Sequence, residues 1–141
     1  MKATWLYRIA AVVFMLFAIG HTLGFLSFRP SSAEDRALFD AMNKVRFAQG
    51  GMTYTYGAFY RGFGLLCSVS MIFSAFLAWH LGKLASKLPR AIGGLGWAFF
   101  AMQIAGIAIC LRYFGAPQAV FSTLVTLCVG AAAWFVPGHA A

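Results

Sequence analysis

The sequence predicts an all-α integral membrane protein: an antiparallel bundle of four transmembrane helices with a short amphipathic helix in the first loop. Two observations predict this fold class. The 141-residue chain is 62% hydrophobic and only 10% charged, which leaves too little polar surface for a soluble domain of this size. The charges also delimit three uncharged runs of about 20 residues (9–28, 62–82 and 91–111), and no charge follows Arg112. A helix of about 20 residues crosses the hydrocarbon of a bilayer.

The uncharged runs and the prolines place the four spans. We expect them at about 5–28, 59–81, 91–111 and 117–136. Pro117 suits the first turn of a helix, and Pro137 is expected to close the fourth span. The alternative for the first span is a cleaved signal peptide, but no small-residue cleavage site follows it at the usual distance. Because the later connections are short, neighbouring helices should pack antiparallel in a single membrane domain, residues 1–141.

The first loop is expected to contain a helix of its own at about 33–47. Ser31 and Glu34 have the spacing of a capping box, which starts a helix. Apolar residues then recur with the period of an amphipathic helix, at Leu38, Ala41, Met42 and Val45. Gly50 and Gly51 are expected to end it. We expect this helix to lie at the membrane interface and to cap one end of the bundle.

The positive charges indicate a membrane surface as partner. In a membrane protein a net charge of +8 is interpreted as loop and interface cations facing anionic lipid headgroups, and not as nucleic-acid binding. The N-terminus and the second loop carry cations and no acid, whereas the first loop holds all three acids. The count of Lys and Arg alone does not favour placing the N-terminus and the second loop in the cytoplasm. We nevertheless expect a bacterial inner-membrane protein with both termini in the cytoplasm.

His21 is the one ionisable group between Arg8 and Arg29. It lies about 4 Å beyond the midpoint of its uncharged run, toward the first loop. The same depth on the other three spans falls on or beside further polar residues. The expected polar layer consists of His21, Thr22, Ser68, Ser70, Gln103 and Thr123, with Thr126 one turn deeper.

This polar layer has two interpretations. Ser, Thr, Gln and His commonly form hydrogen bonds between membrane helices, each worth about 0.6 kcal/mol. Alternatively, the layer forms a small pocket for the polar group of an amphiphile, because ionisable residues inside a membrane are rare and often functional. Gly20 and Gly24 flank His21 in a small-x-x-x-small pattern that lets another backbone approach.

The stretch TYTYGAFYRGFG, residues 53–64, places aromatic residues around Arg61 at the first-loop end of the second span. An aromatic belt with a snorkelling arginine is one interpretation. In the other, Tyr60 and Arg61 form an anion-binding mouth about 12 Å from His21 along the membrane normal. At the opposite interface Trp79, His80 and Trp97 are interpreted as belt residues.

Several kinds of chemistry are not expected. No Asp or Glu lies in a span, which argues against a proton-coupled exporter, and a single histidine near the midplane argues against bis-histidine haem ligation. Cys67, Cys110 and Cys128 are interpreted as small apolar side chains. We therefore predict no metal site, no cofactor and no catalytic residue.

Two motifs resemble those of a known family. The stretches GHTLG (20–24) and FYRGFGLLCSV (59–69) are similar to the first-helix and second-helix motifs of an uncharacterised family of small bacterial four-span membrane proteins. The resemblance implies the four-helix fold and draws attention to His21, Tyr60 and Arg61, but it implies no activity. That family often has an acid just before the Phe-Tyr pair, where this chain has Ala58, which puts an acid–arginine or acid–histidine pairing there in doubt.

Together these observations favour a non-enzymatic membrane protein. It is expected to bind a lipid or another hydrophobic small molecule such as a quinone, or to serve as an accessory subunit of a larger membrane complex. The alternative is a membrane enzyme acting on a lipid or quinone, with His21 as acid/base and Arg61 holding an anionic group. Expected partners are the lipid bilayer, a hydrophobic ligand, and a membrane protein or a second copy of the chain.

Overall fold

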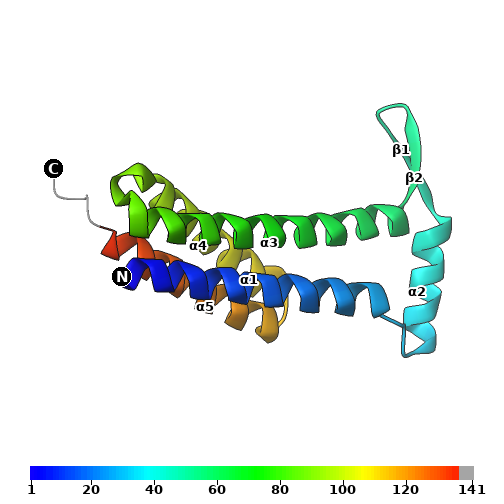
Figure 1. Cartoon of the computed structure of the whole chain (residues 1–141). Helices are drawn as coiled ribbons and strands as arrows, with labels where there is room; N and C mark the ends of the chain where they lie inside the picture. The colour runs from blue at the N-terminus through cyan, green and yellow to red at the C-terminus, as the bar shows by residue number, and fades with distance from the viewer. Residues whose placement is uncertain (137–141) are drawn as a thin grey trace. The chain divides into compact units, whose positions relative to one another are not determined.

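The computed structural model describes residues 1–136, and most of them are helical. The elements in chain order are α1 (Lys2–Ser27), α2 (Ala33–Lys44), β1 (Arg46–Gln49), β2 (Met52–Thr55), α3 (Tyr56–Lys87), the 3-10 helix η1 (Pro89–Ile92), α4 (Leu95–Tyr113) and α5 (Ala116–Phe135) (Figure 1). The helices α1, α3, α4 and α5 are each long and apolar enough to cross a membrane. The prediction of a helical membrane protein with four apolar spans is confirmed at this level. Pro137 lies outside the described residues.

The chain divides into two compact units. Unit one contains Met1–Phe17 and Met71–Ala141, and unit two contains Ala18–Ser70. The division falls within α1 and within α3, so each of these helices contributes to both units.

The core of unit one is built from small side chains around a few large ones. Its largest fully buried side chains are Tyr7 of α1, Leu81 of α3, and Val125 and Val129 of α5. Alanines of the same helices are buried between them, at Ala10, Ala78 and Ala132. Small residues let membrane helices approach closely. Close approach adds packing contacts, which stabilise the bundle because the surrounding lipid is as apolar as the helix side chains.

Two glycines of unit one accept large side chains from neighbouring helices. The Tyr7 hydroxyl lies 2.6 Å from the position that a Cβ at Gly96 of α4 would occupy. At Gly130 of α5, the ring of Phe100 fills the corresponding space. A side chain at either glycine would have to displace the aromatic residue packed there, so neither position has room for a Cβ.

In unit two, α2 begins at Ala33, as the sequence predicted, but its capping pair lies one residue later than expected. The capping box is formed by Ser32 and Asp35: the Ser32 hydroxyl accepts from the Asp35 N–H, and the Asp35 carboxylate accepts from the Ser32 N–H. The expected pair, Ser31 and Glu34, does not form it. The helix ends at Lys44, not near residue 47.

The face of α2 that is partly buried also differs from the expected stripe. Leu38 is 58% exposed, and Val45 lies beyond the last helical residue and is 52% exposed. Phe39 instead packs against the ring of Phe28, with the centroids 5.3 Å apart, and against Tyr60 at 6.4 Å. Met42 of the expected stripe is half-buried, so the stripe is correct in part, and Phe39 adds the aromatic contacts.

A β-hairpin, which was not predicted from the sequence, follows α2. Strands β1 and β2 pair antiparallel, with Arg46 opposite Thr55 and Gln49 opposite Met52. Gly50 and Gly51 form the turn, with φ angles of 58° and 79°. Two consecutive residues with positive φ are typical of the two-residue turn that matches the twist of a hairpin, and glycine adopts them without strain. The two glycines thus reverse the chain and do not simply end a helix.

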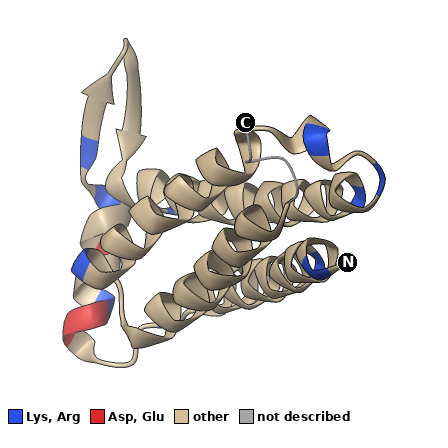
Figure 2. Ribbon diagram, turned by 90° about the vertical axis from the view of Figure 1, so that its left-hand side faces the viewer, with Lys and Arg blue, Asp and Glu red and all other residues tan. Residues whose placement is uncertain are grey.

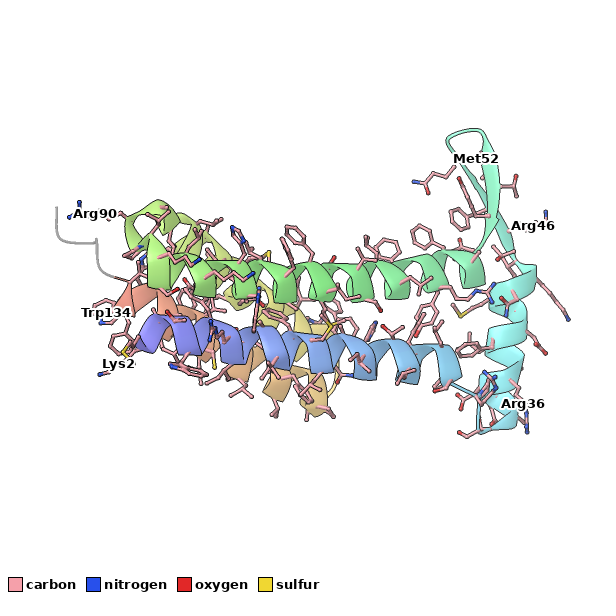
Figure 3. All side chains as sticks on the ribbon, viewed as in Figure 1. Lys2, Arg36, Arg46, Met52, Arg90 and Trp134 are labelled. Carbon is pink, nitrogen blue, oxygen red and sulfur yellow. The ribbon has the colours of Figure 1, made fainter. Side chains whose placement is uncertain are left out.

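Charged residues are distributed unequally between the units. All three acids, Glu34, Asp35 and Asp40, belong to α2, and cations occur in both units (Figure 2). In Figure 3 the labelled side chains of Arg46 and Met52 mark the base and the tip of the hairpin, and Lys2 marks the start of α1.

Candidate functional site

His21 makes a polar contact between α1 and α3 within unit two. Its Nε2 lies 3.1 Å from the carbonyl oxygen of Gly64 on α3. A carbonyl oxygen can only accept, so Nε2 is the ring nitrogen that carries the donated proton. The imidazole is half-buried and stacks on Phe25 one turn further along α1, with the ring centroids 5.8 Å apart. The ring is therefore fixed by one hydrogen bond and one stacking contact.

Gly64 makes this contact possible because it has no side chain. The ring of Phe25 occupies the space that a Cβ at Gly64 would need. The carbonyl of Gly64 is also 3.4 Å from the Ser68 hydroxyl, so it serves both the imidazole and a serine one turn later. Gly62, two residues earlier and therefore on another side of α3, meets nothing within 4 Å.

Thr22 and Ser68 form a second link between the same two helices. Their hydroxyl oxygens are 2.8 Å apart, and Thr22 Oγ1 is also 2.7 Å from the carbonyl oxygen of Ala18. A hydroxyl has one proton and two acceptor lone pairs, so one hydroxyl donates to the other. Ser68 is only 4% exposed, whereas Ser70 is exposed. The structure thus brings together His21, Thr22 and Ser68 from the expected layer, around the backbone of Gly64.

The remaining members of the layer belong to unit one. Gln103 of α4 is half-buried, Thr123 of α5 is exposed, and Thr126 is buried with its hydroxyl donating to the Ser122 carbonyl at 2.7 Å. Whether they share a layer with His21 stays a prediction. Sequence reasoning missed the contact between Cys110 and the Ser122 hydroxyl, 3.4 Å apart, which links α4 to α5.

Tyr60 belongs to a series of aromatic contacts that begins at His21. Phe25 stacks on His21 and lies 5.4 Å from the Tyr60 ring, and Tyr60 meets Phe39 of α2 edge-on. Arg61 follows in the second turn of α3 and is exposed. Tyr60 therefore packs on both α1 and α2, which is a structural role. Each aromatic pair of this kind adds about 0.5–1.5 kcal/mol to the free energy of packing.

Phe47 of β1 extends these aromatic contacts and was not predicted from the sequence. Tyr54, Tyr56 and Phe59 all contact Phe47 of β1. The alternation of threonine and tyrosine in residues 53–56, following two glycines, is a strand and turn pattern. Thr55 then caps α3 by accepting from the Ala58 N–H at 3.1 Å.

A metal-binding cluster is not found among the described residues. Within residues 1–136 no group of three or more His, Cys, Asp and Glu side chains is placed to hold a metal ion. The polar site of unit two consists of hydrogen bonds between α1 and α3, next to an aromatic series. Comparison with models of protein families, with curated proteins and with solved structures found no match for this chain.

Proposed function

We propose that the chain is a non-enzymatic membrane protein that serves as an accessory subunit, and that it binds another membrane protein through the α1 face that carries Gly20 and Gly24. The observation that carries this proposal is the difference between the two sides of α1 in unit two. His21 and Thr22 use their polar groups on α3, whereas Gly20 and Gly24 meet nothing within 4 Å.

The packing of unit two supports the same proposal. Of residues 18–70, all of which are described, only Ala18, Gly57 and Ser68 are buried. Ile19 and Leu23, beside the two glycines, are 50% and 64% exposed. A small-x-x-x-small face flanked by apolar side chains is the surface on which transmembrane helices approach each other most closely.

A ligand-binding role for the polar layer has less support. A pocket for an amphiphile needs polar groups that are directed at the ligand, but His21, Thr22 and Ser68 are within hydrogen-bond distance of one another or of Gly64. The enzyme hypothesis meets the same objection, because the proton on His21 Nε2 is donated to a backbone carbonyl.

The finer architecture belongs to this proposal too. We infer an antiparallel bundle, supported by the two-residue connection between α4 and α5, with α2 at the interface. The proposed location is a bacterial inner membrane with both termini in the cytoplasm. The resemblance of GHTLG and FYRGFGLLCSV to a family of small four-span proteins agrees with this architecture.

Native mass spectrometry of the full chain, extracted with its surrounding lipid from the producing membrane, tests the proposed function. The wild-type chain should retain a second membrane protein at fixed stoichiometry. The Gly24→Leu variant should lose it, because a leucine side chain separates the helix backbones. Gly106→Leu is the matched control: Gly106 lies within α4 and also meets nothing within 4 Å, and its replacement should leave the partner bound.

Three outcomes would contradict the proposal. A bare monomer, or a complex of identical chains only, excludes the role of an accessory subunit. Equal loss of the partner in the two glycine variants would show that the α1 face is not the binding surface. Circular dichroism of each variant checks that its helices are intact.

A further inference from the structure

A second candidate site lies in unit one, where α1 packs against α3. An open groove of about 340 Å³ is lined by Trp5, Arg8, Ile9, Val12, Val13 and Trp79. Arg8 carries the one charge among them, and the others are aliphatic or aromatic. A groove that is apolar along its length and has one cation matches an amphiphile with an anionic head.

Arg8 is held in place by its neighbours. Its guanidinium carbon is 5.5 Å from the ring centroid of Trp5 and 5.4 Å from that of Trp79, within the range of cation–π contacts. Gly82 of α3 leaves room for the aliphatic part of the side chain, since Arg8 Cγ lies 3.5 Å from the position of an added Cβ there. A cation fixed in this way loses little further freedom when it binds an anion.

The guanidinium has no carboxylate side chain to pair with in its own unit. Every Asp and Glu of the chain belongs to α2 in unit two. Arg8 Nε is buried and, among the described residues, has no hydrogen-bond partner. Arginine presents several N–H donors in a plane, a geometry that fits phosphate. Charge complementarity therefore favours a phosphate-bearing ligand.

The position of Arg8 in the sequence distinguishes a lipid from a small anion. Arg8 directly precedes the uncharged run 9–28, so it lies at the edge of the hydrocarbon, where tryptophans and lipid phosphates also lie. Ile9, Val12 and Val13 follow it into the run and line the same groove. A free phosphate would contact only the cation, whereas a phospholipid also covers these apolar side chains.

We propose that this groove binds one anionic phospholipid. The lipid phosphate contacts the Arg8 guanidinium between Trp5 and Trp79, and the first part of an acyl chain lies along Ile9, Val12 and Val13. Further cations of unit one lie at the start of α1 and in the connection from α3 to α4, without acids among them (Figure 2). This site is independent of the α1 face that unit two uses in the proposed function.

The test measures binding of phosphatidylglycerol and phosphatidylcholine to the full chain in detergent by native mass spectrometry. Both lipids carry a phosphate, but the choline cation of phosphatidylcholine neutralises its headgroup. One protein cation is worth about fivefold in affinity for a lipid with a net negative charge, so phosphatidylglycerol should bind about fivefold more tightly than phosphatidylcholine. Arg8→Gln should abolish this preference. Arg112→Gln is the matched control, because Arg112 is also in unit one beside one aromatic ring, Tyr113, and its loss should change nothing.

Two further measurements keep the test decisive. Val12→Trp should reduce phosphatidylglycerol binding while Arg8 stays in place, because the larger ring fills the groove; it also replaces the Arg8 variant if that variant does not fold. Inorganic phosphate in excess should not displace the lipid. Equal binding of the two lipids by the wild-type chain, a preference that survives Arg8→Gln, phosphatidylglycerol binding that Val12→Trp leaves unchanged, or displacement by inorganic phosphate would each overturn the proposal.

Discussion

At the scale of single residues, Gly64 has a role that its neighbour Gly62 does not share. The ring of Phe25 fills the space beside Gly64, and its carbonyl accepts from His21. Gly62 meets nothing within 4 Å. The two glycines lie in the same turn of α3 but differ in what they tolerate. Gly64 cannot accept a side chain without displacing Phe25, whereas Gly62 can accept one.

The pair Gly64→Ala and Gly62→Ala tests this difference. A methyl group at Gly64 must displace Phe25, and overpacking of this kind costs about 1–3 kcal/mol. At Gly62 alanine is the better helix former and should be neutral or stabilising by up to about 1 kcal/mol. Thermal unfolding in detergent, followed by circular dichroism, should give a lower midpoint for Gly64→Ala alone. Equal midpoints for the two variants would contradict the packing of Phe25 on Gly64.

At the scale of elements, the long helices could be predicted from the sequence and the short ones only in part. Uncharged runs of about 20 residues predict four apolar helices, because the length of a span is fixed by the bilayer. The start of α2 could not be settled, since Ser31 and Ser32 each have an acid three residues later. Only the reciprocal hydrogen bonds of Ser32 and Asp35 decide between them.

The hairpin and the contact face of α2 were missed for related reasons. Strands of four residues have too short a pattern to stand out from a helical one, and Gly50 and Gly51 suit a helix end as well as a turn. On α2, the residues Leu38 and Phe39 each begin a helical stripe. The contacts of Phe28 and Tyr60 with Phe39 select the second.

Replacement of the two serines separates the two capping schemes. Ser32→Ala removes the side chain that accepts from the Asp35 N–H and should cost about 1 kcal/mol of local helix stability. Ser31→Ala should cost much less, because the Ser31 hydroxyl reaches only the Asp35 carboxylate, at 3.4 Å. Amide hydrogen exchange in the first turn of α2 measures both effects. Faster exchange in the Ser31 variant than in the Ser32 variant would favour the Ser31 and Glu34 cap instead.

At the scale of the whole molecule, counting residues could suggest which polar residues meet, but not which way each side chain points. Counting from the ends of uncharged runs selected His21, Thr22 and Ser68, and the structure places all three within hydrogen-bond distance of one another or of the Gly64 carbonyl. Depth does not specify which way a side chain points around its helix. The sequence therefore could not separate Ser68, which is buried, from Ser70, which is exposed.

The proposed orientation predicts which side of the membrane each loop faces. In a variant whose three native cysteines are replaced by alanine, a cysteine at Gln49 in the hairpin should react with an impermeant maleimide in intact spheroplasts. A cysteine at Ser86, near the end of α3, should react only after the membrane is opened. Mass spectrometry of the labelled chain measures both reactions. The reverse pattern would place the termini outside the cytoplasm, and labelling of both sites in intact spheroplasts would exclude their separation by a membrane.

The hairpin between α2 and α3 also constrains how deeply α3 can enter the bilayer. Within residues 1–136 its two strands pair only with each other, so each leaves an outer edge of backbone N–H and C=O groups that water or lipid headgroups must hydrate. An open edge of this kind is not tolerated in hydrocarbon. Thr55 directly precedes Tyr56, the first residue of α3. The need to keep the hairpin hydrated thus limits how far the start of α3 can move along the membrane normal into the hydrocarbon.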